Sequence, residues 1–503
     1  MSERTVQPAQ AEAAETDADA LYAARLGKLD ALRRLGIDPY PARYRRTSTT
    51  AEALESFDES TPQQQVHRVA GRIVGRRVMG KASFCHIQDG AGRLQIYVRT
   101  DRVGAEPYRV FRDEIDVGDH IGATGTLFRT RTGEVTLEAT EVVMLSKSLR
   151  PLPEKWHGLQ DVEKRYRQRY LDLIVNRESR EVFLTRTRVV SAIRRFLDER
   201  GFIEVETPCL QPLYGGATAR PFITHYNALD ADVYLRIATE LYLKRLIVGG
   251  FDKVYEIGRV FRNEGLDIHH NPEFTLLETY EAYADYRDVM AMVERMIPRV
   301  ALEALGTTTV KVDGHEVRLD PPWQRVPLRD AIREYSGVDF AEYPDQPSLY
   351  ERVSTLGLPI TPTSPRAKII DELLSQYVEP KLVQPTFLID YPVELSPLAK
   401  RKPDNPDYVE RFEAFAGSFE IANAFSELND PIDQRARFAD QLRNLEAGDV
   451  EAHRMDEDFI LALEHGMPPT GGLGIGIDRL LIFLTGSHSI RDVILFPQMR
   501  ARA

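Results

Sequence analysis

The sequence predicts an α+β protein with a small β-barrel followed by a larger domain, an antiparallel sheet flanked by helices. Three observations predict this arrangement. Short β-rich runs separated by turn residues fill residues 66–143. A glycine-rich run at 471–479 passes directly into an apolar helix at Leu480–Leu484. The region after residue 180 lacks the regular strand–helix alternation that a parallel sheet requires.

The composition indicates a folded, multi-domain protein. A chain of 503 residues, 43% of them hydrophobic, is long enough for two or three domains with their own cores. No apolar run has the length of a membrane span, and the start lacks a signal-peptide pattern. Cys85 and Cys209 lack metal-ligand spacing, which favours reduced thiols in a cytoplasmic protein. The net charge of −12 argues against indiscriminate nucleic-acid binding but allows a local basic face.

The segment before the barrel is expected to contain a tail and a helix. Residues 1–20 are rich in alanine and acidic residues, so we expect a flexible acidic tail. Residues 21–65 form a predicted N-terminal helical extension, in which leucine recurs every third residue from Leu26 to Leu35. The pattern ends near Gly36 and Pro39, as expected for a surface helix or one that contacts a partner.

Residues 66–150 are predicted to form a Greek-key barrel of the OB type, because about five short strands fit into some 80 residues. The clearest runs are Val69–Val74, Arg93–Val98, His120–Phe128 and Glu134–Val143. Eight Lys or Arg residues stand against two Asp between residues 66 and 102, with Phe84, His86 and Tyr97 among them. Cations beside aromatic faces suit single-stranded nucleic acid. An ordinary solvated barrel surface with core aromatics is the alternative.

Residues 151–180 are predicted to be a linker followed by a helix. Pro151–Pro153 and Trp156–Gly158 indicate the linker, and Val162–Ile174 indicates a charged helix. Residues 181–503 make up the large domain. Prolines followed by helical stretches predict a helical insertion at about 322–380.

Three short patterns suggest other enzyme classes and are set aside. His120–Ala123 and Met144–Ser148 look like the two signatures of class I aminoacyl-tRNA synthetases, but they lie too close together within the predicted barrel. The glycines at 472, 474 and 476 do not complete a dinucleotide-binding pattern, and no phosphate-binding loop pattern occurs. The adjacent His269 and His270 would point apart on extended backbone, so neither need bind a metal.

Two windows predict a nucleoside triphosphate site without a phosphate loop. Arg262 lies in a strand-to-loop run at 258–265 and can hold a phosphate with two hydrogen bonds, as lysine cannot. Glu264 can accept from an exocyclic amine, His270 can reach terminal phosphates, and Phe274 offers a face to a purine. Arg479 ends the glycine-rich run and can cover the same ligand. Taken singly, each residue is more often a surface pair or core filler.

Acidic residues predict two further sites. Glu413 and Glu420 lie seven residues apart, where a hairpin would bring them together, and two carboxylates suit Mg²⁺ shared with triphosphate oxygens. Glu240, Glu278 and Glu427 stand in apolar segments, where an acid is costly unless it is paired. If they converge, they would select a substrate with an α-amino group and a cationic side chain. Alternatively, each meets a structural Arg or Lys.

The motifs resemble those of class II aminoacyl-tRNA synthetases and, within them, the bacterial-type lysyl-tRNA synthetases. Residues 196–208, 261–264 and 474–479 resemble motifs 1, 2 and 3, and the likeness covers nearly the whole chain after residue 20. Stretches typical of the lysine enzymes lie at 215–222, 234–238, 270–275, 396–399 and 425–430.

The resemblance implies a role for each matching position. In the nucleotide site, Arg262 would contact the α-phosphate, Glu264 the adenine amine, His270 and Arg479 the distal phosphates, and Phe274 the adenine ring. Mg²⁺ would be held by Glu413 and Glu420. Glu240 would bind the α-amino group, and the rest of the lysine pocket would comprise Gly216, Glu278, Tyr280, Asn423, Phe425 and Glu427. Anticodon contacts would come from Arg77, Phe84, Gln95 and Glu134. Pro208 would lie at the interface of a homodimer.

The resemblance implies ATP-dependent ligation of L-lysine to tRNA through a lysyl-adenylate, with Mg²⁺ as cofactor. The sequence departs from the family pattern at two places next to the expected amino-acid pocket. Both differences are expected to affect the rigidity of the loops there. Thr239 stands where many members have proline, and Leu213-Tyr214 stands where Ile-Pro or Val-Pro is frequent.

Two alternatives are a paralogue that modifies a protein or small molecule, and a nucleic-acid-binding protein with an inactive large domain. The basic barrel argues against the first, and the intact Arg262, Glu413, Glu420 and Arg479 argue against the second. The related aspartate and asparagine enzymes share the architecture, but an acidic pocket would repel aspartate.

Overall fold

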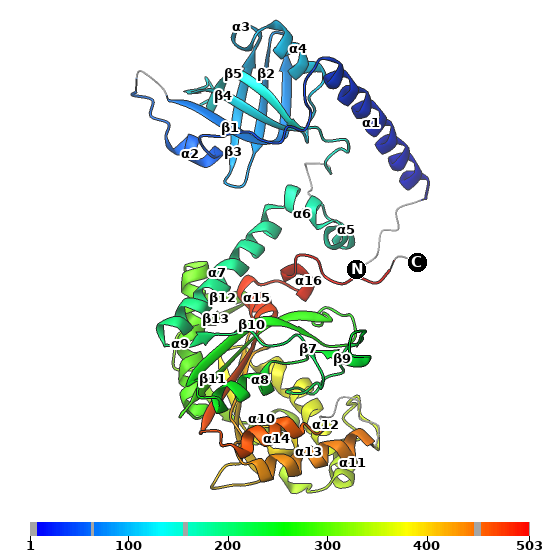
Figure 1. Ribbon diagram of the computed structural model, residues 1–503, viewed down its shortest axis with the longest axis vertical. Helices are drawn as coiled ribbons and strands as arrows, with labels where there is room; N and C mark the ends of the chain where they lie inside the picture. The colour runs from blue at the N-terminus through cyan, green and yellow to red at the C-terminus, as the bar shows by residue number, and fades with distance from the viewer. Residues whose placement is uncertain (1–7, 62–64, 154–158, 447–453, 502–503) are drawn as a thin grey trace. The chain divides into compact units, whose positions relative to one another are not determined.

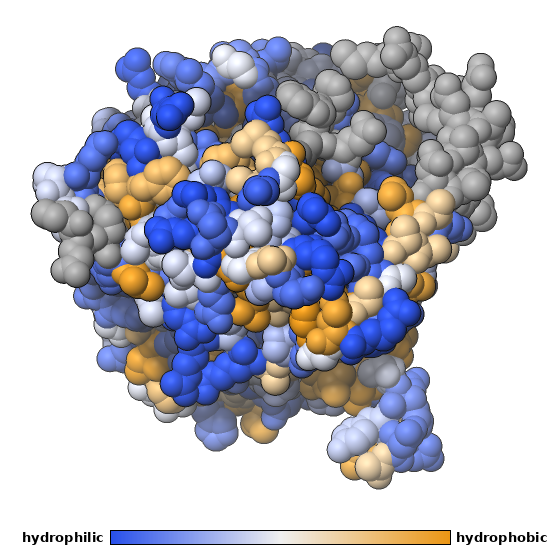
Figure 2. All heavy atoms as spheres, turned by 90° about the horizontal axis from the view of Figure 1, so that it is seen from above, coloured by the Kyte–Doolittle hydropathy of each residue, from blue (hydrophilic) through white to orange (hydrophobic). Residues whose placement is uncertain are grey.

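The computed structural model describes residues 8–61, 65–153, 159–446 and 454–501. The chain forms two compact units, Met1–Leu159 and Gln160–Ala503 (Figure 1). The face seen in Figure 2 is mainly hydrophilic, with apolar residues in small separate groups. None of the described helices combines the length and apolar character needed to cross a bilayer.

The first unit contains a closed five-stranded barrel, which confirms the predicted OB fold. Its strands run in the order β1-β2-β3-β5-β4, and only β3 and β5 pair in parallel. Alternate side chains of β2 and β3 point inward, so the barrel interior contains residues such as Cys85, Ile87 and Ile96. The strands are β1 (Val66–Met79), β2 (Ala82–Gln88), β3 (Arg93–Arg99), β4 (His120–Arg129) and β5 (Val135–Ser146). Between β3 and β4 lie α3 (Thr100–Val103) and α4 (Ala105–Asp113).

Helix α1 (Pro8–Arg34) begins inside the stretch expected to be a flexible tail. Residues 8–20 are helical in the structure, in keeping with the high helix propensity of their alanine and glutamate residues, whereas residues 1–7 lie outside the described part. The partner of the leucine face is the barrel itself, since Leu32 is fully buried in the barrel cluster. Arg25 donates to the carbonyls of Val117 and Ser148, each at 2.9 Å. A second helix, α2 (Thr50–Glu55), carries a capping box between Thr49 and Glu52.

The stretch predicted as one charged helix after the linker is two helices in the structure. They are α5 (Val162–Arg167) and α6 (Arg169–Val175). The helix is interrupted at Gln168, whose φ and ψ are −116° and 53°. Buried Asp172 accepts from Arg165 at 2.9 Å and from Arg169 at 2.7 Å, so the break brings both arginines to one carboxylate. Linker residues 154–158 lie outside the described part.

An eight-stranded sheet organises the second unit and confirms the predicted antiparallel core. Its order is β14-β15-β16-β17-β18-β11-β10-β6, with parallel pairing only at the β14–β15 and β10–β6 ends. The strands are β6 (Ile203–Glu204), β10 (Lys253–Phe261), β11 (Glu273–Ala282), β14 (Gln324–Pro327), β15 (Thr386–Pro392), β16 (Tyr408–Ala416), β17 (Phe419–Ser426) and β18 (Thr470–Gly476).

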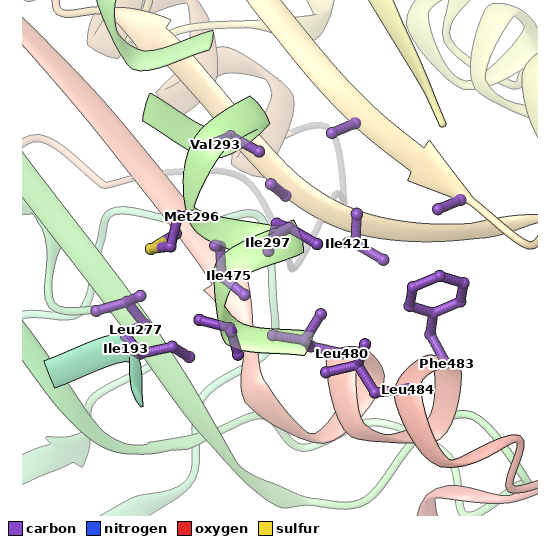
Figure 3. Packing of buried hydrophobic residues seen from close by; sticks show 14 of the residues in the cluster. Ile193, Leu277, Val293, Met296, Ile297, Ile421, Ile475, Leu480, Phe483 and Leu484 are labelled. Carbon is purple, nitrogen blue, oxygen red and sulfur yellow. The ribbon is translucent and has the colours of Figure 1, made fainter. Parts of the chain in front are cut away.

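One face of this sheet carries the main hydrophobic core. Helices α7 (Arg177–Glu199), α9 (Tyr286–Leu305) and α15 (Ile477–Thr485) pack against it (Figures 1 and 3). Leu277 of β11 and Ile475 of β18 point into this core, and each is fully buried. Full burial of such a side chain contributes about 1.5–3 kcal/mol. The neighbouring positions on each strand point to the opposite face, which is left for a site.

The remaining elements surround the sheet. A small sheet has the order β7-β9-β8, and the region predicted as a helical insertion has its own hydrophobic cluster around Leu328 and Phe340. The elements are β7 (Leu210–Gln211), β8 (Ile223–Tyr226), β9 (Ala231–Leu235), α8 (Glu240–Val248), β12 (Thr309–Val312), β13 (His315–Arg318), α10 (Leu328–Ser336), η1 (Phe340–Glu342), α11 (Gln346–Val353), α12 (Arg366–Leu373), η2 (Leu374–Val378), η3 (Glu379–Lys381), η4 (Val393–Leu395), α13 (Pro431–Glu446), α14 (Glu457–Glu464) and α16 (Ile490–Val493).

Candidate active site

A cavity of about 450 Å³ lies on the sheet face opposite the core. Strands β11, β17 and β18 form its floor, and the loop after β10 and the start of α8 contribute to its walls. The structure brings together every residue predicted for the nucleotide, amino-acid and metal sites. These are Gly216, Glu240, Arg262, Glu264, His270, Phe274, Glu278, Tyr280, Glu413, Glu420, Asn423, Phe425, Glu427 and Arg479.

The glycines of β18 make room for this cavity. A methyl group at Gly472 would overlap Glu427 Oε1 and would lie 2.8 Å from Tyr280 Cε1. A methyl group at Gly474 would meet only the carbonyl oxygen of Asn423, at 3.8 Å. Gly472 is therefore required by the protein's own side chains, whereas Gly474 leaves open space in the cavity.

Arg262 presents an available positive charge to the cavity. Its backbone N–H donates to the carbonyl of Pro272 at 2.9 Å, which fixes the position of the loop after β10. Its guanidinium carbon lies 5.1 Å from the centre of the Phe274 ring, a cation–π contact. Across the described residues, no carboxylate forms an ion pair with Arg262, so its charge is available to an anionic ligand.

Arg479 and Glu420 form an ion pair of 2.8 Å at the first turn of α15. The preceding residue, Asp478, was not predicted and is nearly fully buried. It accepts from the backbone N–H of Thr275 at 2.6 Å and from Arg186 of α7 at 2.5 Å. Asp478 therefore joins α15, β11 and α7 and fixes where Arg479 enters the cavity.

The two histidines after the motif at 258–265 both line the cavity. Asp267 orients His270 by an interaction of 2.8 Å with Nδ1 and accepts from the backbone N–H groups of both histidines at 2.7 Å. His270 Nε2 lies 4.0 Å from Glu264. In the described residues no group of three or more His, Cys, Asp or Glu is arranged to hold a metal ion.

Three acids meet at the far end of the cavity, and each is nearly fully buried. The exposed fractions of Glu240, Glu278 and Glu427 are 6%, 5% and 1%. Glu278 accepts from the backbone N–H of Thr239 and from the hydroxyl of Tyr280, each at 3.2 Å. Burial and, to a smaller extent, the nearby charge of Glu240 raise the pKa of Glu278 to about 7.

The two departures from the family pattern are accommodated in this structure. Thr239 precedes α8, and its N–H supplies a hydrogen bond that proline could not give to Glu278. Tyr214 is buried, its ring centre lies 5.1 Å from that of Tyr234, and Arg454 contacts both rings. Aromatic packing thus supports the loop at the position where proline is frequent in the family that the motifs resemble.

Lys244 of α8 was missed by the sequence analysis. Its side chain is fully buried and its ammonium contacts both Glu240 and Glu427. The sequence also allowed each acid to meet a structural Arg or Lys instead of a substrate. This alternative holds for Glu240 and Glu427, which both contact Lys244. The spacing of Glu240 and Lys244, four residues apart on a helix, was the available signal.

Glu413 and Glu420 lie on the β16–β17 hairpin, as their spacing predicted. Glu413 accepts from the Tyr391 hydroxyl at 2.8 Å and from Arg411, which was not predicted, at 2.6 Å. Burial raises the pKa of Glu413 to about 7, against the opposing charge of Arg411. Two carboxylates without nitrogen or sulfur ligands fit a hard cation such as Mg²⁺, which would take further oxygens from phosphate or water.

Three of the four predicted anticodon residues lie on adjacent strands of the barrel, Arg77 on β1, Phe84 on β2 and Gln95 on β3, and Glu134 directly precedes β5. Phe84 stacks on Tyr97 with ring centres 4.3 Å apart and planes inclined by 16°, and Arg77 is its neighbour across the β1–β2 pair. Gln95 donates to Glu134 at 2.7 Å. These side chains offer an aromatic platform beside hydrogen-bonding groups.

The basic character of the barrel is weaker than the sequence count indicates. Arg99 pairs with Asp101, and Arg102 pairs with Glu138 at 2.6 Å. Their charges are therefore partly neutralised within the barrel.

The class I signature-like stretches have a structural role. Lys147 is buried between Asp116 at 2.6 Å and Asp119 at 2.8 Å, and His120 lies at the start of the neighbouring strand β4. This packing agrees with the interpretation that the two stretches are not catalytic signatures.

Comparison with known families agrees with the geometry. Residues 161–500 match the family of tRNA synthetases class II (D, K and N), and residues 67–145 match an OB-fold nucleic acid binding domain. The chain belongs to the class II tRNA synthetases and is therefore an enzyme.

Similar curated proteins cover almost the whole chain. A protein from Pelotomaculum thermopropionicum is 57% identical over 495 residues, which is 98% of this chain and 97% of that protein. One from Moorella thermoacetica is 57% identical, covering 96% and 98% of the two chains, and one from Chloroflexus aurantiacus is 56% identical, covering 96% and 99%. Each of these relatives is named Lysine–tRNA ligase.

Proposed function

We propose that this protein activates L-lysine with ATP and transfers it to tRNA. The observation that carries the proposal is the division of one cavity into two halves. Arg262 and Arg479 face an anionic ligand, whereas Glu240, Glu278 and Glu427 face a cationic one. A lysyl-adenylate would form where the two halves meet.

The arginine half would bind ATP. The guanidinium of Arg262, which forms no ion pair in the described part of the chain, suits the α-phosphate, where it can neutralise charge that develops during the reaction. Phe274 would stack on the adenine, and Glu264 would accept from its amine. His270 and Arg479 would contact the distal phosphates.

Glu413 and Glu420 would hold Mg²⁺ together with phosphate oxygens. The ion would supply charge neutralisation on the triphosphate. Arg411 and Tyr391 orient Glu413 for this task through the two hydrogen bonds described above.

The acidic half would bind lysine. Glu240 would take the α-amino group, and Glu278, Tyr280 and Glu427 would take the ε-ammonium. Asn423 and Phe425 would line the pocket. Gly216 has a φ of 85°, and a methyl group there would lie 3.0 Å from Glu240 Cβ, so glycine is needed beside the α-amino site.

The chemistry requires no protein nucleophile. The lysine carboxylate attacks the α-phosphorus of ATP, the bond to the bridging oxygen breaks, and pyrophosphate leaves. A terminal hydroxyl of the tRNA then attacks the lysyl carbonyl and releases AMP. Alignment of the two ligands on a rigid sheet supplies much of the rate.

The barrel would bind the tRNA anticodon through Arg77, Phe84, Gln95 and Glu134. The stacked pair of Phe84 and Tyr97 supports this proposal, since single-stranded bases stack on aromatic faces. Use of tRNA implies that the enzyme works where translation occurs, in the cytoplasm.

A homodimer would form through the segment around Pro208. Exposed apolar residues near this segment support the proposal, among them Ile203, Leu210 and Ile223 with exposed fractions of 50%, 53% and 62%. Apolar side chains gathered on short strands are typical of a surface that a second copy covers.

Amino-acid-dependent exchange of pyrophosphate into ATP tests the proposed activation. Lysine should support exchange, and Arg262→Ala should abolish it without unfolding the protein. The control Arg295→Ala removes an exposed arginine of α9 and should retain exchange. Near-normal exchange by folded Arg262→Ala would contradict the role of Arg262, and lack of lysine-dependent exchange by the unaltered protein would contradict the proposed substrate.

A further inference from the structure

Lys244 is an internal cation at the amino-acid end of the cavity, and its position calls for an explanation. A charged side chain is rarely fully buried, because removal from water is costly unless partners compensate. Lys244 has two carboxylate partners on different elements, Glu240 of its own helix and Glu427 just after β17. Its Nζ also lies 5.6 Å from the Phe425 ring and 6.0 Å from the Phe459 ring.

Lys244 stands behind the cavity wall. Glu240, Glu427 and Phe425 line the cavity, but Lys244 does not. Apart from its ion pair with Lys244, Glu427 has no hydrogen-bond partner for either oxygen among the described residues. Lys244 therefore approaches the acids from behind and leaves their remaining capacity for a ligand.

The charges at this end of the cavity can be counted. Glu240, Glu278 and Glu427 contribute three negative charges, and Lys244 contributes one positive charge. The other groups that face them are Tyr280, which is neutral because burial raises its pKa well above the usual value, and Arg411, whose charge pairs with Glu413 at 2.6 Å. Burial raises the pKa of all three acids, and Lys244 opposes this rise for Glu240 and Glu427. When the three acids are ionised the pocket has a net charge of −2, and free lysine brings two ammonium groups.

We infer that Lys244 is a fixed counter-cation that sets the charge of the pocket to match a substrate with two ammonium groups. It is a positioning and specificity residue, since it orients Glu240 and Glu427 without touching the substrate. The inference rests on the proposed use of lysine and adds a reason why three acids serve two cations. Without Lys244 the pocket would hold one negative charge too many, and a carboxyl would take up a proton instead of binding an ammonium.

Removal of the charge tests the inference. In Lys244→Met, the KM for lysine in pyrophosphate exchange should rise about 10-fold or more at pH 7, while the KM for ATP stays within about twofold. In the unaltered protein the KM for lysine should fall as the pH rises and the acids ionise. In Lys244→Met this fall should occur at higher pH, because Glu240 and Glu427 lose the cation that favours their ionised forms. Lys244→Arg retains the charge and should keep the pH profile of the unaltered protein even if its larger side chain raises KM.

The barrel offers a matched control. Lys147 is also fully buried between two carboxylates, but it lies in the other unit. Lys147→Met should lower thermal stability and leave both KM values in exchange unchanged. A folded Lys244→Met protein with the lysine KM and pH profile of the unaltered protein would overturn the inference, and so would an equal rise in the KM for ATP.

A measurement on the unaltered protein does not depend on the folding of any variant. Calorimetric titration with lysine at pH 8, in buffers of different ionisation enthalpy, counts the protons released on binding. A balanced pocket should release close to none, and release of one proton or more would overturn the inference. Failure of the unaltered protein to use lysine would instead reject the proposed function, so the two failures are distinguishable.

Discussion

Gly472 is the position where one added methyl group should disturb the amino-acid pocket most directly. The methyl of Gly472→Ala would overlap Glu427 Oε1 and approach Tyr280 Cε1 to 2.8 Å. Both neighbours are buried and packed on several sides, with exposed fractions of 1% and 3%, so neither can swing into solvent. Glu427 must therefore move away from the position in which it would meet the ε-ammonium.

The size of the effect follows from the interaction that is lost. A hydrogen bond to a charged group contributes about 1.5–3 kcal/mol, which corresponds to about 10- to 150-fold in affinity. We expect the Kd for lysine, measured by calorimetry without ATP, to rise by this factor. Thermal unfolding of the same sample would show that the fold is retained.

Gly474→Ala is the matched control for this prediction. It adds the same methyl group to the same face of β18, but its nearest neighbour lies 3.8 Å away. Lysine binding should change much less than in Gly472→Ala. Equal weakening in the two variants, or a Kd within about twofold of the unaltered protein in Gly472→Ala, would refute the steric argument.

Four further outcomes are expected. Phe84→Ala should lower kcat/KM for tRNA in aminoacylation by about 5- to 150-fold, since stacking on one base is worth about 1–3 kcal/mol. Pyrophosphate exchange should be unchanged in this variant. An equal loss of aminoacylation and exchange would contradict a role of Phe84 in tRNA binding. Because Glu278 has a pKa of about 7 and binds an ammonium only when ionised, the lysine KM should fall from pH 6 to pH 8. Thr239→Pro removes the backbone N–H donor to Glu278 and should shift that fall to higher pH, whereas Thr239→Ala keeps this donor and should shift the fall less. Ornithine, one methylene shorter, should be disfavoured by about 1–3 kcal/mol and support measurable exchange at saturation, so exchange at background level would contradict the prediction.

The barrel and the main sheet could be predicted because their signals are local. Alternation along β2 and β3 and the turn residues between them are properties of a few neighbouring residues. The same holds for Glu413 and Glu420, whose spacing on a hairpin brings them to one side. The break at Gln168 depends instead on the burial of Asp172, which sequence alone does not reveal.

The residues that hold the site in place were harder to predict. Lys244, Arg411 and Asp478 act through partners that tertiary structure supplies, such as Glu427 for Lys244 and Thr275 for Asp478. An aspartate before an arginine has no distinctive pattern of its own, and the i,i+4 spacing of Glu240 and Lys244 gives no sign of the second partner, Glu427. Counting charges along the barrel overestimated its basic face for the same reason, because the count could not include the pairing of Arg102 with Glu138.

The alternation of β11 has a consequence for how such a domain can diversify. Leu277 supports the core, while Leu276 and Glu278 on either side of it face the cavity. Substitutions at ligand-facing positions can therefore change the preferred amino acid without repacking the interior. Insertion or deletion of one residue would instead exchange the two faces and place Glu278 in the core. A sheet of this kind permits new specificities by substitution and resists changes in length, which is a physical reason why one family serves amino acids as different as aspartate, lysine and asparagine.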